Sequence, residues 1–534
     1  MKKLKFLSWL FLLALAFSAS AQVENTGKKG ELDEAQLKRW SHLDLVADTV
    51  PGMSVDKAYR ELLKGKKSTT VVVGVIDSGV DIEHEDLKSV VWTNPREIAG
   101  NGIDDDKNGY VDDVNGWNFL GDITKENYEL DRIAHNPSLA EPAVYAKAKE
   151  QKDKKVKEAA PAKKHYEGML NQLDRSQDII AKKLGKTDYT AEEVAAIEST
   201  DPEIERSKAF LLQMFNYGMS MDDLRKEILK EYEKNATLVA DPTAFKDYRA
   251  EKLGDDPENL NARNYGNGNV MGPDKEEILH GTHVAGIIAQ TRGNNIGGDG
   301  IADNVKIMTI RAVPDGDEYD KDIALAIRYA VDNGAKVING SFGKSFSPHK
   351  QWVYDAIKYA ESKDVLIVHA AGNDAKDIDV EDNFPNDSDD KVNEFASNVL
   401  TIGALNPEYG TMMVADFSNY GKNNVDIFSP GVKIYATTPN NTYQYLQGTS
   451  MASPNVAGVA ALIREYYPKL TAKQVKEIIM ASGTEITFDV AVGGDPEKKK
   501  KLSDLSRTGR IVNAYNALVL AEKVSKGKVK TIKG

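Results

Sequence analysis

A chain of 534 residues, of which 41% are hydrophobic and 28% charged, is long enough for one large domain with an insertion or for two or three domains. Its formal net charge of −13 would repel a phosphate backbone, so we expect no nucleic acid partner. The sequence contains no cysteine, which excludes disulfide bonds, thiolate metal sites and a cysteine nucleophile.

The first 21 residues have the pattern of a secretory signal peptide. Lysines near the start precede an apolar run from Trp9 to Phe17, and the small residues Ala19 and Ala21 frame a cleavage site. No later segment approaches the roughly 18 consecutive apolar residues that a bilayer span needs. We therefore expect an exported protein, periplasmic or extracellular, without stable membrane insertion.

After a mixed and polar stretch, residues 22–68, which we expect to be an arm packed onto the next domain, the sequence becomes strongly apolar. The run TTVVVGVIDSG is rich in β-branched residues and ends near Asp77, which is typical of a strand buried on both faces of a parallel sheet. Similar runs recur further on, with amphipathic helical stretches between them that are long enough for crossover connections. These later runs are residues 305–313, 336–339, 365–370 and 399–404.

Alternating strands and helices predict an α/β fold with a doubly wound, mostly parallel sheet. We assign this sheet to residues 69–121 and 270–524, followed by a C-terminal tail at 525–534. Within it, the lysine-rich residues 497–501 are expected to form an exposed turn before a closing helix.

An acidic segment follows the first strand. Asp104, Asp106 and Asn108 stand at alternate positions, and a turn glycine and Asp112 come next. Side-chain oxygens at this spacing resemble those of an EF-hand loop and can wrap a hard cation. The twelfth position holds Asn115 instead of the bidentate glutamate, so a complete EF-hand is not supported. We expect these four residues to hold a structural calcium ion, and the alternative is an acidic turn without an ion.

Residues 122–269 interrupt the alternation of strands and helices. They are rich in Lys, Glu and Ala at helical spacing and have almost no strand signal, which predicts a charged helical insertion. Two interpretations remain open for it, a solvated helical appendage and a lid or regulatory subdomain.

Four residues in separate segments supply the groups that acyl transfer by a serine needs. Asp77 closes a strand at its C-terminal end, where open α/β sheets place their sites. His280 begins a helix, and His283 follows one turn later on the same side. Ser450 opens a long apolar helix, and Asn373 follows a strand end, where its amide can donate to an oxyanion. Each residue alone also fits a turn, a cap or a packing role.

The segments DSGVD, HGTHVAG, NGSFG, AAGN and GTSMASP, in that order, resemble the signature blocks of the subtilisin-like serine protease family. The resemblance covers residues 71–84 and 279–521. It implies that Asp77 is the orienting acid, His280 the general base, Ser450 the nucleophile and Asn373 the oxyanion donor, with His283 a packing residue. It also implies that no catalytic cofactor is needed.

The resemblance further implies two groups of residues that contact a polypeptide substrate. The first would pair with extended substrate backbone, and the second would form a wall of the primary specificity pocket. These groups are Ser341, Phe342 and Gly343, and Ala370, Ala371 and Gly372.

The favoured function is therefore secreted serine endopeptidase activity through an acyl-enzyme. A catalytically silent binding or scaffold protein with the same fold is the alternative, and hydrolysis of a small ester or amide would use the same groups. A silent relative would be expected to have lost Asp77, His280, Asn373 or Ser450, and all four are present.

Overall fold

The computed structural model describes residues 31–215, 220–243 and 245–529, so the predicted signal peptide lies outside the described residues. The chain divides into two compact units. Among the described residues, the sheet unit covers 31–129 and 247–529, and the helical unit covers 130–246. No helix in the described ranges is both long and apolar enough to cross a membrane.

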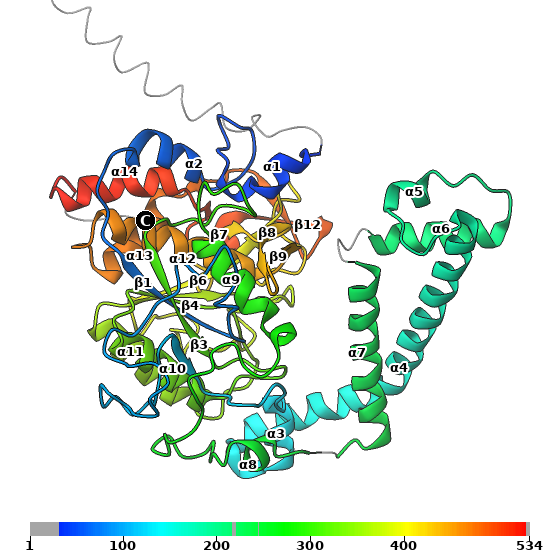
Figure 1. Cartoon of the computed structure of the whole chain (residues 1–534), viewed down its shortest axis with the longest axis horizontal. Helices are drawn as coiled ribbons and strands as arrows, with labels where there is room; N and C mark the ends of the chain where they lie inside the picture. The colour runs from blue at the N-terminus through cyan, green and yellow to red at the C-terminus, as the bar shows by residue number, and fades with distance from the viewer. Residues whose placement is uncertain (1–30, 216–219, 244, 530–534) are drawn as a thin grey trace, which may run out of the picture. The chain divides into compact units, whose positions relative to one another are not determined.

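Within the part of the chain that the structure describes, nine strands of the sheet unit form one sheet in the order β10-β13-β7-β6-β5-β4-β1-β3-β2. Figure 1 labels β1, β3, β4, β6 and β7 of this sheet. Neighbouring strands are parallel except for β10 and β13. The strands are β1 (Val71–Asp77), β2 (Gly116–Asn118), β3 (Val305–Arg311), β4 (Val337–Gly340), β5 (Leu366–Ala370), β6 (Val399–Leu405), β7 (Ile427–Pro430), β10 (Thr484–Glu485) and β13 (Arg510–Ile511).

The direction of strand addition reverses at β1. From β1 the chain adds β2 and then β3, which lies between β1 and β2, on one side, and then crosses back to add β4 on the other side, so β1 and β4 flank the point of reversal. Open α/β sheets bind ligands beyond the C-terminal ends of the strands at such a point. The predicted doubly wound, mostly parallel α/β fold is confirmed.

Helices cover both faces of this sheet. Val73 and Val75 of β1 belong to an apolar cluster with side chains of α9, α12, α13 and α14, whereas Ile76 belongs to a second cluster with α10 and α11. Successive side chains of a strand point to opposite faces, so a continuous apolar run fills both layers. The helices are α9 (Leu279–Ala289), α10 (Asp320–Asp332), α11 (Lys350–Ser362), α12 (Thr449–Tyr466), α13 (Ala472–Ser482) and α14 (Ala514–Ser525).

The segment before β1 is built into the sheet unit. It contains α1 (Glu34–Lys38) and α2 (Val55–Ala58), with short turns of other helix types beside them. Trp40 is 1% exposed, and its Nε1 donates to the carbonyl of Val432 at 3.0 Å. Met53 is fully buried in the larger apolar cluster. The expected arm therefore contributes core side chains.

The lysine-rich residues 497–501 are not a turn, and this prediction was wrong. They lie in β12 (Asp495–Lys501), which pairs antiparallel with β11 (Asp489–Val492). Val490 is buried on β11, while the lysines of β12 remain exposed. Lysines on such a strand discourage pairing with another chain, and their polarity concealed the strand in the sequence. A second hairpin is formed by β8 (Ile434–Thr438) and β9 (Thr442–Leu446).

The helical unit covers a narrower range than the expected insertion at 122–269, because the flanking segments belong to the sheet unit. On the C-terminal side, Arg249 in α8 (Tyr248–Lys252) is 1% exposed, and it forms ion pairs with Glu126, Asp255 and Asp322. This buried network fixes both connecting segments in the sheet unit.

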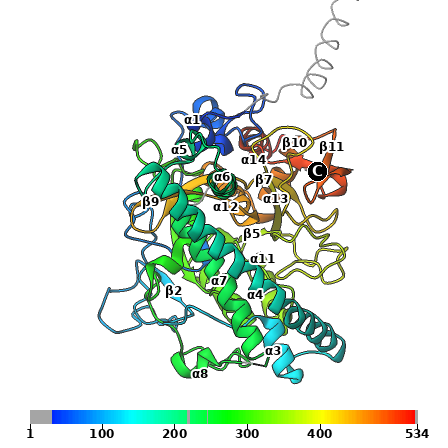
Figure 2. The ribbon, with the colours of Figure 1, turned by 90° about the vertical axis from the view of Figure 1, so that its right-hand side faces the viewer.

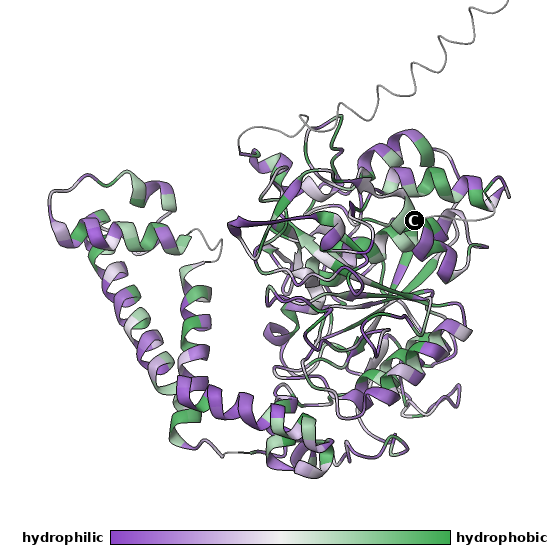
Figure 3. Ribbon diagram, turned by 180° about the vertical axis from the view of Figure 1, so that it is seen from behind, coloured by the Kyte–Doolittle hydropathy of each residue, from purple (hydrophilic) through white to green (hydrophobic). Residues whose placement is uncertain are grey.

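The helical unit contains almost only helices, and α4 and α7 run side by side in it (Figures 1 and 2). Its core is a small apolar cluster that includes Leu173, Leu211 and Ile228. The first part of α4 is mostly hydrophilic (Figure 3). The helices are α3 (Glu129–His135), which starts in the sheet unit, α4 (Pro142–Leu184), α5 (Ala191–Ala195), α6 (Pro202–Phe215) and α7 (Met221–Ala240).

Candidate active site

The four predicted catalytic residues come from the ends of elements at one edge of the sheet. Asp77 is the last residue of β1, and Asn373 lies just beyond the end of β5. His280 and Ser450 are each the second residue of a helix, α9 and α12 respectively. Because parallel strands end at the same edge, residues far apart in the sequence are brought together here.

Asp77 and His280, 203 positions apart, are joined by a hydrogen bond of 2.7 Å between Oδ1 and Nδ1. The Asp77 side chain is 2% exposed, and that of His280 is 38% exposed. A carboxylate can only accept, so Nδ1 carries the proton and Nε2 is left as an acceptor. Burial lowers the pKa of His280, but the charge and hydrogen bond of Asp77 outweigh it and raise the pKa above its ordinary value.

A glycine permits this close approach of α9 and β1. A Cβ on Gly281 would lie 2.1 Å from the carbonyl oxygen of Gly79 and 3.0 Å from Cβ of Asp77. Any side chain at this position would push the start of α9 away from the strand end. The glycine after His280 is therefore required by packing.

His283 has a different environment from His280. It is fully buried, and its Nε2 lies 3.0 Å from the carbonyl of Ile434 and 3.1 Å from that of Gln444. Burial is the main cause that lowers its pKa to about 3, so the ring is neutral and donates from Nε2. His283 thus holds the β8–β9 hairpin against α9, as expected for a packing residue.

Ser450 lies in the first turn of α12, after Gly448, whose φ of 149° favours glycine. Its hydroxyl donates to the carbonyl of Ser341 at 3.3 Å, and within the described residues it makes no hydrogen bond to His280. Catalytic hydrogen bonds are commonly long or absent before substrate binds, so a rotation of the hydroxyl is needed for proton transfer.

Asn373 is oriented by the residue before the serine. Its Oδ1 accepts from the N–H of Thr449 at 2.8 Å and from the Thr449 hydroxyl at 2.9 Å, which leaves Nδ2 free of these contacts. A Cβ on Gly448 would lie 3.4 Å from Nδ2 of Asn373 and 3.5 Å from the backbone nitrogen of Ser450. The absent side chain therefore leaves open a point that two donors flank, and such a point suits a developing oxyanion.

The predicted substrate-contacting residues border a cavity of about 150 Å³ beside Ser450. Of the six, Phe342, Gly343, Ala370 and Gly372 line it, whereas Ala371 is fully buried in the core. A cavity of this size holds a group about as large as benzene. Five further lining residues were not predicted from the sequence, because nothing local marks them as substrate contacts; they are Lys344, Ser345, Asp374, Asn383 and Thr449.

Two contacts hold the predicted substrate edge that follows β4. Ser341 is 4% exposed, and its hydroxyl donates to the carbonyl of Ser450 at 2.9 Å. His369 on the neighbouring strand β5 contacts the carbonyl of Phe342 through Nε2 at 2.7 Å. Burial lowers the pKa of His369 to about 4, so this ring is neutral and Nε2 is the donor.

The acidic segment is arranged differently from the expected calcium loop. The Asp112 carboxylate accepts from the backbone N–H groups of residues 100, 101 and 102, and that of Asp104 accepts from the N–H groups of residues 108 and 109. These two side chains therefore stabilise the turn itself. The side chain of Asn108 donates to Asp113 at 2.9 Å, and its oxygen accepts from the N–H of Tyr110.

Of the four predicted ligands, Asp106 alone joins a group of carboxylates whose oxygens lie within 4.8 Å of one another, together with Glu97 and Asp113. One buried oxygen of Glu97 has no hydrogen-bond partner within the described residues. Three carboxylates with one unsatisfied oxygen suit a hard cation. Arg96, however, already contacts Asp106 at 2.9 Å, and Tyr329 donates to Asp113 at 2.6 Å.

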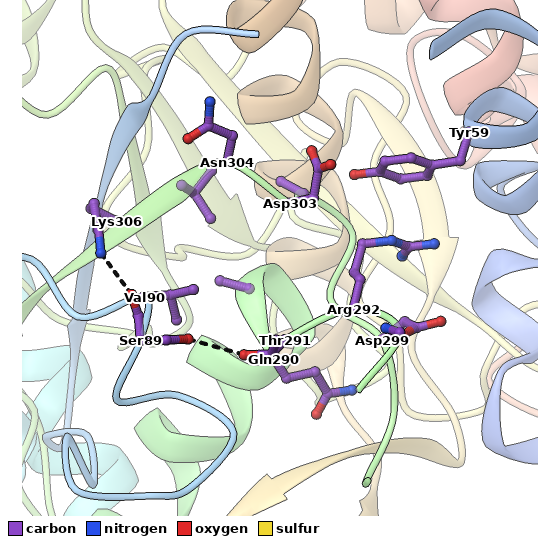
Figure 4. Close-up of a pocket in the computed structure, with 14 residues that line it drawn as sticks. Tyr59, Ser89, Val90, Gln290, Thr291, Arg292, Asp299, Asp303, Asn304 and Lys306 are labelled. Atoms are coloured by element: carbon purple, nitrogen blue, oxygen red, sulfur yellow. Dashed lines mark hydrogen bonds between the residues drawn. The ribbon is translucent and has the colours of Figure 1, made fainter. Parts of the chain in front are cut away.

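A larger cavity, of about 660 Å³, lies away from the catalytic residues, where β3 begins and α9 has ended (Figure 4). Polar side chains line much of it, including Arg292 and Asp299. Lys306 donates to the carbonyl of Ser89, whose hydroxyl contacts that of Thr291. Its lining residues include hydroxyl groups and carboxylates but no histidine, so the smaller cavity beside Ser450 is the better candidate for acyl transfer.

The sequence model of the subtilase family matches residues 68–503. The chain is 43% identical over 185 residues to a thermophilic serine proteinase of Bacillus sp. (strain AK1), a match that covers 34% of this chain and 42% of the relative. A cell wall-associated protease of Bacillus subtilis (strain 168) is 36% identical over 41% of this chain and 22% of its own length. Subtilisin DY of Bacillus licheniformis is 36% identical over 39% of this chain and 71% of its own length. The chain thus spans less than half the length of the first two relatives.

Proposed function

Because the chain belongs to the subtilase family, we propose that it is a secreted serine endopeptidase that hydrolyses polypeptides through an acyl-enzyme on Ser450. The observation that carries this proposal is the hydrogen bond of 2.7 Å between Asp77 and His280, at the sheet edge where Ser450 opens α12. The similar relatives are named as proteinases and subtilisins, which supports the same reaction.

In the proposed mechanism, Nε2 of His280 takes the hydroxyl proton as Ser450 Oγ attacks the carbonyl carbon of the scissile peptide bond. Asp77 keeps the ring oriented and stabilises the imidazolium that forms. Nδ2 of Asn373 and the N–H of Ser450 donate to the oxyanion. His280 then gives its proton to the leaving amine, and water releases the acyl group by the same steps in reverse.

All groups that these steps need are side chains or backbone N–H groups of the chain, so we propose no catalytic cofactor. The N-terminal position of Ser450 on α12 contributes as well, since the N–H groups that open a helix have no acceptor within it. Export is supported by the predicted signal peptide.

The proposal is tested by reacting the purified protein with a fluorophosphonate probe and mapping the labelled peptide. We expect labelling at Ser450 and hydrolysis of casein, with both lost in Ser450→Ala. The matched control is Ser453→Ala, because Ser453 lies one turn later on α12, is fully buried and donates to Asn339. Folded protein that neither takes the label nor cleaves casein would favour the silent scaffold.

We further propose a structural calcium ion at the acidic segment, near Asp106. The carboxylates of Glu97 and Asp113 support this position. The side chains of the other three ligands predicted from the sequence form hydrogen bonds within the acidic segment; they are Asp104, Asn108 and Asp112. An ion at 100 times its dissociation constant stabilises a folded protein by about 2.7 kcal/mol, so chelation should lower the melting temperature.

Terbium luminescence provides a direct readout of this site. We expect Glu97→Gln to abolish terbium binding that calcium can displace, with peptidase activity retained. Asp105→Asn is the control, since Asp105 accepts from Ile98 and Asn101 and is outside the carboxylate group. Equal terbium affinity in Glu97→Gln and wild type would contradict a calcium site here.

A further inference from the structure

Lys344 immediately follows the predicted substrate edge, Ser341–Gly343, and is unusually buried for a lysine. Its side chain is 2% exposed. Its backbone N–H donates to the carbonyl of Phe384 at 3.0 Å, and the N–H of Phe384 donates back at 2.9 Å. Lysines are almost never fully buried unless they are paired. The edge thus continues into a residue that is held by both its backbone and its side chain.

The ammonium group of Lys344 meets three acceptors. These are Oε1 of Glu129 at 2.9 Å, Oδ1 of Asp320 at 2.8 Å and the carbonyl oxygen of Glu318 at 2.5 Å. The side chains of Glu129 and Asp320 are at most 3% exposed. An ammonium group has three donors, so the set is complete, and a buried charge needs such partners.

The two carboxylates belong to elements that are distant in the sequence. Asp320 begins α10, and it also accepts from the hydroxyl of Ser347 at 2.6 Å and from the N–H of His349 at 2.8 Å. Glu129 begins α3, the helix that enters the helical unit at Leu130. One buried centre therefore fastens the chain after the substrate edge to the starts of two helices.

We propose that Lys344 is a positioning residue for substrate: anchored by Glu129 and Asp320, it holds Ser341–Gly343 in a fixed, extended conformation that pairs with the substrate backbone. This inference rests on the proposed peptidase function, because it assumes that this edge contacts substrate. An edge that is already ordered loses less conformational entropy on binding, which favours affinity.

Substrate length separates this role from a general effect on the fold. Lys344 makes no hydrogen bond to Asp77, His280 or Ser450 within the described residues, so its loss should act on binding along the edge. A tetrapeptide anilide reaches the edge, whereas a single-residue ester with the same pocket residue reaches only the pocket beside Ser450, which Lys344 also lines. Any effect of Lys344→Met on the pocket is therefore shared by both substrates. We expect KM to rise about tenfold more for the tetrapeptide than for the ester, with kcat for the tetrapeptide changed by less than about threefold.

Arg464→Met is a matched control. Arg464 is also a buried cation, 3% exposed, and it donates to the carbonyls of Lys336 and Asp364. It lies about 21 Å along α12 from Ser450, far from the edge. We expect it to lose thermal stability without a length-dependent change in KM. A length-dependent rise in KM of the same size in Arg464→Met would overturn the proposal, as would equal rises for both substrates in Lys344→Met.

If Lys344→Met does not fold, Glu129→Gln is tested instead, because the amide keeps the shape of the side chain and one hydrogen bond to Lys344 while removing the charge. A larger rise in KM for the tetrapeptide than for the ester supports the proposal. An equal change in KM for the two substrates overturns it. If the wild-type protein hydrolyses neither substrate, the dissociation constant of the same tetrapeptide is measured for Ser450→Ala with and without Lys344→Met. Weaker binding with Lys344→Met supports the positioning role of Lys344, although the proposed peptidase function has failed. An equal dissociation constant overturns the positioning role of Lys344.

Discussion

The sheet unit and the helical unit are stabilised in different ways. In the sheet unit, two apolar clusters fill both faces of a parallel sheet, and buried ions such as Arg249 and Lys344 are paired on several sides. In the helical unit, the core is a single small cluster, and ion pairs such as that of Arg225 with Asp174 are about half exposed.

This difference has energetic consequences. Exposed ion pairs contribute about 0–1 kcal/mol each, whereas removing one partner of a buried pair costs about 3–5 kcal/mol. The sheet unit therefore has the rigidity that a catalytic geometry requires, and the helical unit depends on a few apolar contacts. If chemistry resides in the sheet unit alone, changes in the two units should separate activity from local stability.

The largest expected effect lies inside the sheet unit, at the two histidines of α9. His280→Ala should lower kcat by about 10⁶-fold, the size found for the equivalent deletion in a subtilisin, because the ring that accepts the proton is gone. His283→Ala should lower the melting temperature by breaking the contact with the β8–β9 hairpin, while the folded protein keeps most of its kcat. Steady-state kinetics and thermal melts of both variants test this. Lower activity in His283→Ala than in His280→Ala would contradict the assignment of the base.

A smaller loss is expected for Asn373→Ala. Its amide bonds the substrate oxygen only as charge develops, so kcat should fall by about 10²–10³-fold with little change in KM. The control is Asn383→Ala, since Asn383 lines the same cavity but does not contact Thr449. Asn383→Ala should change which substrates are preferred, and it should lower kcat for all substrates much less than Asn373→Ala does. A change confined to KM in Asn373→Ala would contradict its role as an oxyanion donor.

The same substitution in each unit compares their cores directly. Leu211 in α6 and Leu366 in β5 are both fully buried, and replacing a buried leucine with alanine costs about 2–5 kcal/mol. We expect Leu211→Ala to destabilise the helical unit and to leave kcat/KM unchanged. We expect Leu366→Ala to lower the temperature at which the protein loses its peptidase activity. Hydrogen exchange of each unit and residual activity after heating provide the measurements. Equal loss of kcat/KM in the two variants would show that catalysis depends on the helical unit.

The smallest effect concerns pH and Glu318, whose carbonyl contacts Lys344. Burial is the main cause that raises the pKa of the Glu318 carboxyl to about 8, and the charge of Lys344 opposes it. Since the same carboxyl has a lower pKa when unfolded, its contribution to stability is complete below about pH 4.5 and is lost as the pH rises to about 8. Glu318→Gln should therefore reduce the fall in melting temperature of the sheet unit between pH 5 and pH 8.

The helical unit is the internal reference for this measurement. Among its described residues, hydrogen bonds lower the pKa of Glu192 and of Glu193, in contrast to the raised pKa of Glu318. Its melting transition should change equally in wild type and Glu318→Gln. A pH dependence of the sheet unit that is unaltered by Glu318→Gln would contradict the assignment to this carboxyl.

The sequence by itself determined the α/β class, the five adjacent strands β1, β3, β4, β5 and β6, and the four candidate catalytic residues. These follow from local patterns: continuous β-branched runs for strands buried on both faces, and short motifs at the ends of elements. Asp77, His280 and Ser450 could be recognised because each stands in its own motif. Their roles remain proposals, although the geometry between Asp77 and His280 agrees with them.

Other features depended on partners that only the tertiary structure brings together. Glu129 and Lys344 are 215 positions apart, and no local pattern marks either as buried. The carboxylates near Asp106 likewise include Glu97, outside the spacing that suggested an ion-binding loop. A polar side chain becomes a core residue when a distant charge compensates its desolvation, and that compensation has no signature in the neighbouring sequence.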